Sequence, residues 1–227
     1  MLAVIKRELK KYFLSPVGYV VIGIFLVIFS IFFYLTSIVQ ASVDLTYLFY
    51  YAALYGLMLI IPILTMGLFA DERKSGTEQL LITSPISMTK IVLAKFIAAT
   101  AIIIITELCT LMYFGILCHY AVPNIPTYLT SALGFLLLAM VYISFGMLAS
   151  SITEHQVIAG VITTGFVIAT TFLPYFVDAI SGFSLIDLFT KFLYGQIDIA
   201  NTITFVSIII LCLLITMILM QRRKSVK

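Results

Sequence analysis

The sequence predicts an all-α membrane protein that forms a single domain, 1–227, with six transmembrane helices. Two properties of the whole chain lead to this fold class. The 227 residues are 63% hydrophobic and only 10% charged, whereas soluble domains are about half apolar and about a quarter charged. The mean hydropathy is +1.19. In addition, uncharged runs recur that are long enough for a helix of about 20 residues across the hydrocarbon core of a bilayer.

Charges and prolines delimit these runs. Pro16 gives a natural helix start before the first run, and Asp44 separates that run from the second. Pro123 and Pro126 divide an uncharged stretch that is too long for one helix, and Pro174 closes the fifth run. The six predicted spans are 17–39, 45–69, 91–117, 128–150, 156–173 and 202–220.

Lysines and arginines near the ends of the spans predict the orientation in the membrane. Six spans place both termini and the loops 70–95 and 151–155 on one side, which then carries twelve of the thirteen basic residues. Lys191 alone belongs to the other side. We therefore expect the basic side, with both termini, to be cytoplasmic.

The first residues, 1–14, are predicted to form an amphipathic helix along the membrane interface. Apolar residues recur at helical spacing, and four basic residues occupy the remaining face. An anchor for the membrane surface and a docking element for a partner are both open interpretations of this helix. The apolar residues are Leu2, Ile5, Leu9, Tyr12 and Phe13, and the basic residues are Lys6, Arg7, Lys10 and Lys11.

The loop after the second span is the most highly charged part of the chain, and it is predicted to contain a short helix, 75–83. Ser75 and Glu78 fit a capping box, in which each side chain satisfies a backbone N–H at the start of a helix. Apolar residues follow at once, and their exposure outside the membrane favours a docking surface. These residues are Leu80, Leu81 and Ile82.

On the other side of the membrane, the segment 178–201 is too long for a turn and too apolar for water. We expect short outer helices there, interfacial or re-entrant, because irregular backbone at membrane depth must be covered by protein or face a water-filled cavity.

Catalytic and metal chemistry is not expected. The sequence has no G-x-x-x-x-G-K-[ST] phosphate loop, so the chain is not expected to hydrolyse ATP by that route. The cysteines and histidines lack the spacing of metal ligands, and a net charge of +3 argues against nucleic-acid binding. These residues are Cys109, Cys118, Cys212, His119 and His155.

Three residues within the predicted spans are candidates for polar or close contacts. Glu107 is an acid deep in the third span, where a charge is costly. It is expected either to line a translocation path or to be a neutral carboxyl that is hydrogen-bonded to a neighbouring helix. Gly146 and Ser150, four residues apart, predict a close contact between helices.

The block 64–96 has the pattern of a known family. It contains Asp71-Glu72-Arg73-Lys74, then Ser75-Gly76-Thr77-Glu78, the pair Leu80-Leu81, Thr83-Ser84-Pro85, and Lys95 near the start of the next span. With this pattern the chain resembles the ABC-2 type permease family over essentially its whole length. The start, Lys6-Arg7-Glu8-Leu9 through Pro16-Val17-Gly18, is similar to the gliding-motility and nitrous-oxide-reductase-maturation branch.

The resemblance implies a half-transporter, which exports a substrate across the cytoplasmic membrane of a prokaryote. Two permease subunits would pair, as a homodimer or heterodimer, and each would dock a cytoplasmic ABC ATPase that binds ATP and Mg²⁺. The segment 1–14 would be the elbow helix, and 178–201 would close the exit. The coupling helix would contact the ATPase through Ser75, Gly76, Thr77, Glu78, Leu80, Leu81, Ile82 and Thr83.

Two other functions are compatible with the residues alone. A secondary transporter driven by an ion gradient usually shows internal repeats and paired intramembrane charges, but no repeat relates 1–114 to 115–227. A degenerate permease that only anchors another protein to the membrane would have much the same sequence.

Overall fold

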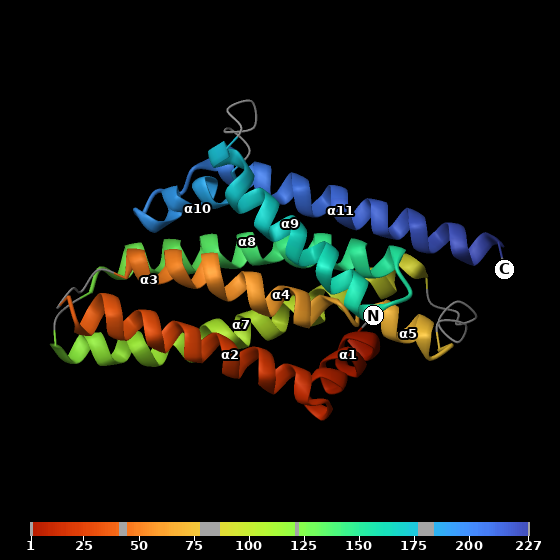
Figure 1. Ribbon diagram of the computed structural model, residues 1–227, viewed down its shortest axis with the longest axis horizontal. Helices are drawn as coiled ribbons and strands as arrows, with labels where there is room; N and C mark the ends of the chain where they lie inside the picture. The colour runs from red at the N-terminus through yellow and green to blue at the C-terminus, as the bar shows by residue number, and fades with distance from the viewer. Residues whose placement is uncertain (1, 41–44, 78–86, 121–122, 177–183, 227) are drawn as a thin grey trace.

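The computed structural model spans residues 1–227, and it describes all of them except 1, 41–44, 78–86, 121–122, 177–183 and 227. Every regular element among the described residues is a helix (Figure 1). The elements are α1 (Leu2–Leu14), α2 (Pro16–Phe33), the π-helix η1 (Tyr34–Ile38), α3 (Thr46–Tyr51), the π-helix η2 (Ala52–Gly56), α4 (Leu57–Thr65), α5 (Ala70–Lys74), α7 (Met88–Tyr120), α8 (Ile125–Ile152), α9 (Gln156–Phe176), α10 (Leu185–Leu193) and α11 (Ile199–Val226).

Six helical stretches are long and apolar enough to cross a membrane, so the predicted fold class is confirmed. They are Pro16–Ile38, Thr46–Lys74, Met88–His119, Ile125–Ile152, Gln156–Pro174 and Ile199–Arg223.

Several helices continue beyond the ranges expected from the sequence. Helix α7 begins at Met88 and ends at Tyr120, and α11 continues to Val226. Apolar composition marks the part of a helix that suits hydrocarbon, whereas the helix itself ends only where its backbone hydrogen bonds end. In the second span, by contrast, the helix ends before the end predicted for the span at residue 69. Helix α4 ends at Thr65, and residues 66–69 form a turn before α5. This turn becomes part of the candidate site.

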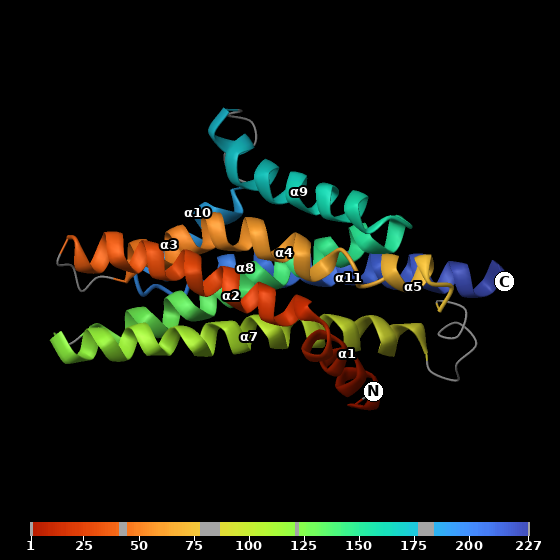
Figure 2. The same cartoon turned by 60° about the horizontal axis from the view of Figure 1, so that its bottom comes forward.

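The helix α8 lies at the centre of the bundle and packs against α4, α7, α9, α10 and α11 (Figure 1). Aromatic side chains join it to the first two spans. Phe25 of α2 lies 5.5 Å from Phe135 of α8 and 5.7 Å from Phe29, and Phe29 lies 5.9 Å from Phe49 of α3, as distances between ring centroids. A view turned by 60° shows that the C-terminal end of α9 lies farther from the other helices than its N-terminal end does (Figure 2).

The helix α10 occupies half of the described part of the predicted outer segment, 178–201. Ser184 caps it by accepting a hydrogen bond from the backbone N–H of Asp187 at 3.2 Å. Phe189 and Phe192 face the bundle and are fully buried. A Cβ atom at Gly134 of α8 would lie only 2.6 Å from the Cβ of Phe192, so glycine allows α10 to lie directly on α8.

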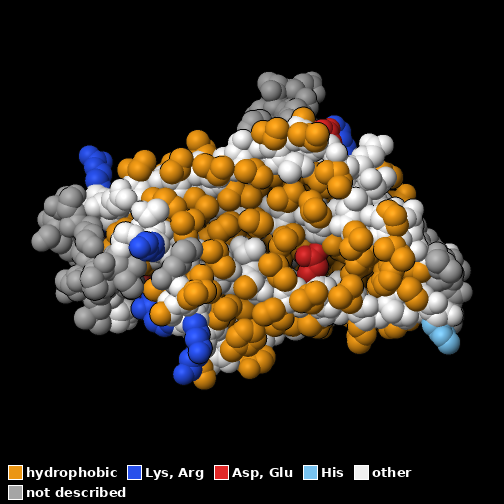
Figure 3. Space-filling view, turned by 180° about the vertical axis from the view of Figure 1, so that it is seen from behind, with side chains coloured by type: hydrophobic (Ala, Val, Ile, Leu, Met, Phe, Trp, Pro, Cys, Tyr) orange, Lys and Arg blue, Asp and Glu red, His pale blue; other side chains and the backbone are white. Residues whose placement is uncertain are grey.

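Basic side chains gather at one end of the bundle, which we call the basic end (Figure 3). It comprises α1, α5, the first turns of α7, the turn between α8 and α9, and the last turns of α11. The opposite end comprises α3 and α10, and Lys191 of α10 pairs there with Asp198 at 2.7 Å.

Candidate functional site

A buried lysine joins three elements at the basic end. Lys95 lies two turns into α7, and its side chain is 0% exposed. Its Nζ donates hydrogen bonds to Oε2 of Glu8 at 3.2 Å, to Oε1 of Glu72 at 2.8 Å and to the backbone oxygen of Leu68 at 2.8 Å. All three donors of the ammonium group are therefore used. The Nζ atom of Lys95 also lies over the face of the Phe69 ring, 5.3 Å from its centroid.

The two acids come from different helices. Glu8 belongs to α1, where Val4, Glu8 and Tyr12 recur every four residues on one helical face, and this is the face that is buried. Glu72 belongs to the short helix α5, which follows the turn 66–69. Lys95 therefore fastens the amphipathic helix α1 to both sides of the charged loop, because α5 enters the loop and α7 leaves it. We call Glu8, Glu72 and Lys95 the ion cluster.

Two further basic residues of α1 lie close to acids of α1 and α5. Arg7 lies 2.6 Å from Oε1 of Glu8 and 3.6 Å from Oε1 of Glu72, and Lys11 lies 3.7 Å from Oδ2 of Asp71. Burial alone would raise the pKa of the Glu8 carboxyl, but the positive charges of Lys95 and Arg7 outweigh it and lower the pKa below its ordinary value of 4.5. Glu8 is therefore a carboxylate at neutral pH.

Acid pH is expected to weaken the attachment of α1. Because the pKa of Glu8 is lower in the folded chain than in the unfolded chain, its contribution to stability is complete above pH 4.5 and is lost as the pH falls through the lower, folded value. We expect the thermal midpoint of wild type to exceed that of Glu8→Gln by a few degrees at pH 7, since about 1 kcal/mol shifts a chain of this size by about 2–4 °C. This difference should shrink as the pH falls below 4.5. A difference that stays constant with pH would contradict a charged role for Glu8.

The turn 66–69 is held by a second set of contacts. Ser150 of α8 is fully buried, and its Oγ accepts hydrogen bonds from the backbone N–H groups of Phe69 at 3.0 Å and Ala70 at 3.2 Å. The same hydroxyl donates to the backbone oxygen of Met66 at 3.0 Å. Arg73 of α5 donates to the backbone oxygens of Ser151 at 2.7 Å and Thr153 at 2.9 Å. The entrance to the charged loop is thus fixed to α8.

The predicted coupling helix 75–83 is described only at its first residues. Ser75 follows the last turn of α5, and its hydroxyl donates to the backbone oxygen of Asp71 at 2.8 Å. Gly76 has a φ of +72°, which favours glycine, and Thr77 lies next to the Ser75 hydroxyl at 2.9 Å. Glu78, Leu80, Leu81, Ile82 and Thr83 lie outside the described residues, so the capping box and the docking leucines stay predictions.

The other sequence candidates lie elsewhere in the bundle. Gly146 of α8 lies directly against Thr65 of α4, where a Cβ atom would be 2.8 Å from the Cβ of Thr65. Glu107 lies in the middle of α7 and is half-buried, and its Oε1 has no hydrogen-bond partner within the described part of the chain. The molecule seen from behind is largely apolar, with an acidic side chain among the hydrophobic ones (Figure 3). Glu107 lies twelve residues after Lys95 on the same helix, and no hydrogen bond or ion pair among the described residues joins it to the ion cluster.

Sequence reasoning did not single out Glu8 or the function of Lys95. The available signal was the spacing of Val4, Glu8 and Tyr12, which puts one acid on the apolar side of a basic helix. Among the described residues, no group of three His, Cys, Asp or Glu side chains could hold a metal ion.

These features define a class of protein: a multi-pass membrane protein with six candidate spans and a charged loop that is fastened to the bundle. The sequence model of the ABC-2 family transporter proteins matches residues 2–208, from α1 into α11, and the chain therefore belongs to the ABC-2 transporter family. Members of this family are typically permease subunits without catalytic activity of their own. Comparison with curated protein sequences gives no match.

Proposed function

We propose that the chain is the permease subunit of an ABC exporter, nearest the gliding-motility and nitrous-oxide-reductase-maturation branch. A separate cytoplasmic ATPase binds and hydrolyses ATP with Mg²⁺, and a second permease subunit completes the transporter in the cytoplasmic membrane of a prokaryote. The basic end faces the cytoplasm, because eleven described basic residues belong to its elements and such residues favour the cytoplasmic side.

The observation that carries this proposal is the ion cluster. A loop that only connects two spans needs no buried salt bridges, which are costly to desolvate. Here Lys95 joins α1, α5 and α7, while Ser150 and Arg73 join the turn 66–69 and α5 to α8. A force on the loop therefore moves α1, α7 and α8 together. This is what a permease requires when ATP hydrolysis by a partner must rearrange its spans.

A charge in the predicted docking surface is expected to weaken ATPase binding. We expect Leu80→Asp and Leu81→Asp to lower the affinity for the ATPase subunit about tenfold to a hundredfold, because each puts an unpaired carboxylate into an apolar contact. Gln79→Asp adds the same charge in the same loop and should have a smaller effect. The measurement is co-purification with the ATPase, followed by ATP hydrolysis and transport in proteoliposomes.

The same experiment separates the alternatives. Transport that needs no ATPase and follows an imposed ion gradient would identify a secondary transporter. Binding of the ATPase without ATP-dependent transport would identify an anchor. Wild-type affinity and transport in both Leu80→Asp and Leu81→Asp would place the coupling surface outside 75–83.

A further inference from the structure

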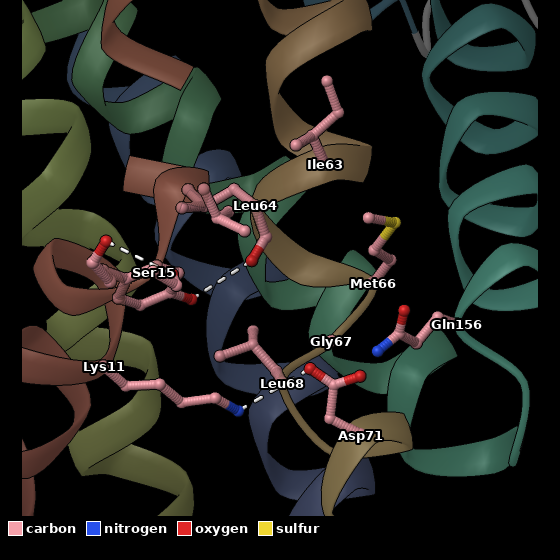
Figure 4. A pocket seen from close by; sticks show the side chains of 11 residues that line it. Lys11, Ser15, Ile63, Leu64, Met66, Gly67, Leu68, Asp71 and Gln156 are labelled. Atoms are coloured by element: carbon pink, nitrogen blue, oxygen red, sulfur yellow. Dashed lines mark hydrogen bonds and ion pairs between the residues drawn. The ribbon is translucent and has the colours of Figure 1, made fainter. Parts of the chain in front are cut away.

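A cleft of about 150 Å³ opens at the basic end, where α1 meets α2 and faces α4 and α9 (Figure 4). Its walls are apolar, and its polar groups come from α1, α5 and α9. The ammonium of Lys11 and the carboxylate of Asp71 face each other, and Gln156 extends from α9 on the far side of that carboxylate (Figure 4). The residues that matter here are Val17, Ile63 and Leu64 for the apolar walls, and Lys11, Asp71 and Gln156 for the polar part.

The charged pair in the cleft is incompletely satisfied. Nζ of Lys11 lies 3.7 Å from Oδ2 of Asp71, which is too long for a hydrogen bond. Oδ1 of Asp71 is buried and has no hydrogen-bond partner among the described residues. A carboxylate that is partly removed from water and receives no donor is unfavourable. The Asp71 side chain is 33% exposed, so a ligand in the cleft that carries N–H donors can reach the accessible part of this carboxylate.

The ends of three spans locate the cleft at the membrane surface. The first span begins at Pro16, directly after α1, α4 ends at Thr65, and α9 begins at Gln156. Hydrocarbon gives way to lipid headgroups at the level where spans begin and end. The cleft therefore presents both charges of the Lys11–Asp71 pair at headgroup level, with its apolar walls continuing into the hydrocarbon.

We propose that this cleft binds the headgroup of a phospholipid that carries a primary ammonium, of the phosphatidylethanolamine type. The ammonium donates to the carboxylate of Asp71, and the phosphate accepts from Lys11. One molecule thus supplies both opposite charges at once. An anionic lipid without an amine leaves Asp71 unsatisfied, and a quaternary ammonium has no N–H to donate.

The dimensions of the cleft fit a headgroup and exclude a whole lipid. A cavity of about 150 Å³ can hold a group of the size of benzene. The acyl chains lie outside, along the faces that continue from Val17 and Ile63, where Val20 is 44% and Leu59 is 51% exposed. Gly67 lets Asp71 lie against the turn 66–69, since a Cβ atom there would be 2.5 Å from Oδ2 of Asp71.

The test is lipid retention by the purified subunit, measured by native mass spectrometry after equilibration with equal amounts of phosphatidylethanolamine, phosphatidylcholine and phosphatidylglycerol. We expect wild type to retain one phosphatidylethanolamine with about a tenfold preference over the other two. Asp71→Asn should abolish the preference, and Ser15→Leu, which fills the cleft beside Val17, should abolish retention. No ATPase is present, so the result is independent of the transport function proposed above.

Gly23→Leu is the matched control for Ser15→Leu, because it adds the same side chain to α2, which Ser15 directly precedes, at a position where a Cβ meets nothing within 4 Å. It should retain lipid like wild type. Equal retention of the three lipids by wild type, or an unchanged preference in Asp71→Asn, would overturn the proposal. Asp71→Asn keeps the size and shape of the side chain. We therefore expect this variant to have the gel-filtration volume and the thermal midpoint of wild type, so that a change in lipid preference reflects binding rather than misfolding.

Discussion

Replacement of Lys95 by methionine is expected to lower the free energy of unfolding by about 3–5 kcal/mol, because it leaves buried carboxylates without their cation. The side chains of Glu8 and Glu72 are only 3% and 12% exposed. Methionine keeps the unbranched shape of the lysine stem, so the loss is one of charge and hydrogen bonds rather than of packing. Reversible unfolding in mixed micelles measures the effect.

Two controls separate charge from general damage. Lys191→Met makes the same substitution in an ion pair whose side chains are 52% and 31% exposed, and it should change stability far less. The triple variant Lys95→Met, Glu8→Gln, Glu72→Gln removes the charges of the whole ion cluster and should recover much of the lost stability. If the triple variant is as unstable as Lys95→Met alone, uncompensated charge is not the cause.

Lys95→Met alone should also release α1 from the bundle. The basic residues of α1 are targets for trypsin, and cleavage there requires that the helix open locally. We therefore expect faster cleavage of α1 in Lys95→Met than in wild type, with ATPase-driven transport reduced even where the ATPase still binds.

The spans were predictable because the signal for each is local. Twenty consecutive apolar residues identify a span without reference to any other part of the chain. The turn 66–69 was not predictable, since Met66, Leu68 and Phe69 are as apolar as the helix before them. The turn is held by hydrogen bonds to Ser150, whose position is 81 residues from Phe69 in the sequence.

The ion cluster could not be read from the sequence for the same reason. Lys95 and Glu8 are 87 residues apart, and each taken alone resembles an ordinary charge near the end of a helix. Only the packing of α1 beside α7 makes them partners. The resemblance of the block 64–96 to the ABC-2 family pointed to the loop, but it did not show that α1 is joined to it by a buried salt bridge.

Ser150→Ala is expected to lower the free energy of unfolding by about 2–4 kcal/mol, although it removes a single oxygen atom. That oxygen is the partner of the backbone N–H groups of Phe69 and Ala70 and of the backbone oxygen of Met66. Each buried polar group left without a partner costs about 1–3 kcal/mol, and partial entry of water reduces the sum. The measurement is the same micellar unfolding as for Lys95→Met.

Ser151→Ala is the matched control, because Ser151 is the next residue of the same helix and is equally buried, but its hydroxyl donates only to the backbone oxygen of Leu148 in its own helix. A carbonyl that already accepts a helical hydrogen bond loses little when that hydroxyl is removed, so we expect a change of about 0.5 kcal/mol or less. Equal losses in the two variants would mean that Ser150 stabilises α8 itself. A loss confined to Ser150→Ala, accompanied by ATPase activity that no longer drives transport, would show that this hydroxyl holds the turn through which the loop acts on the bundle.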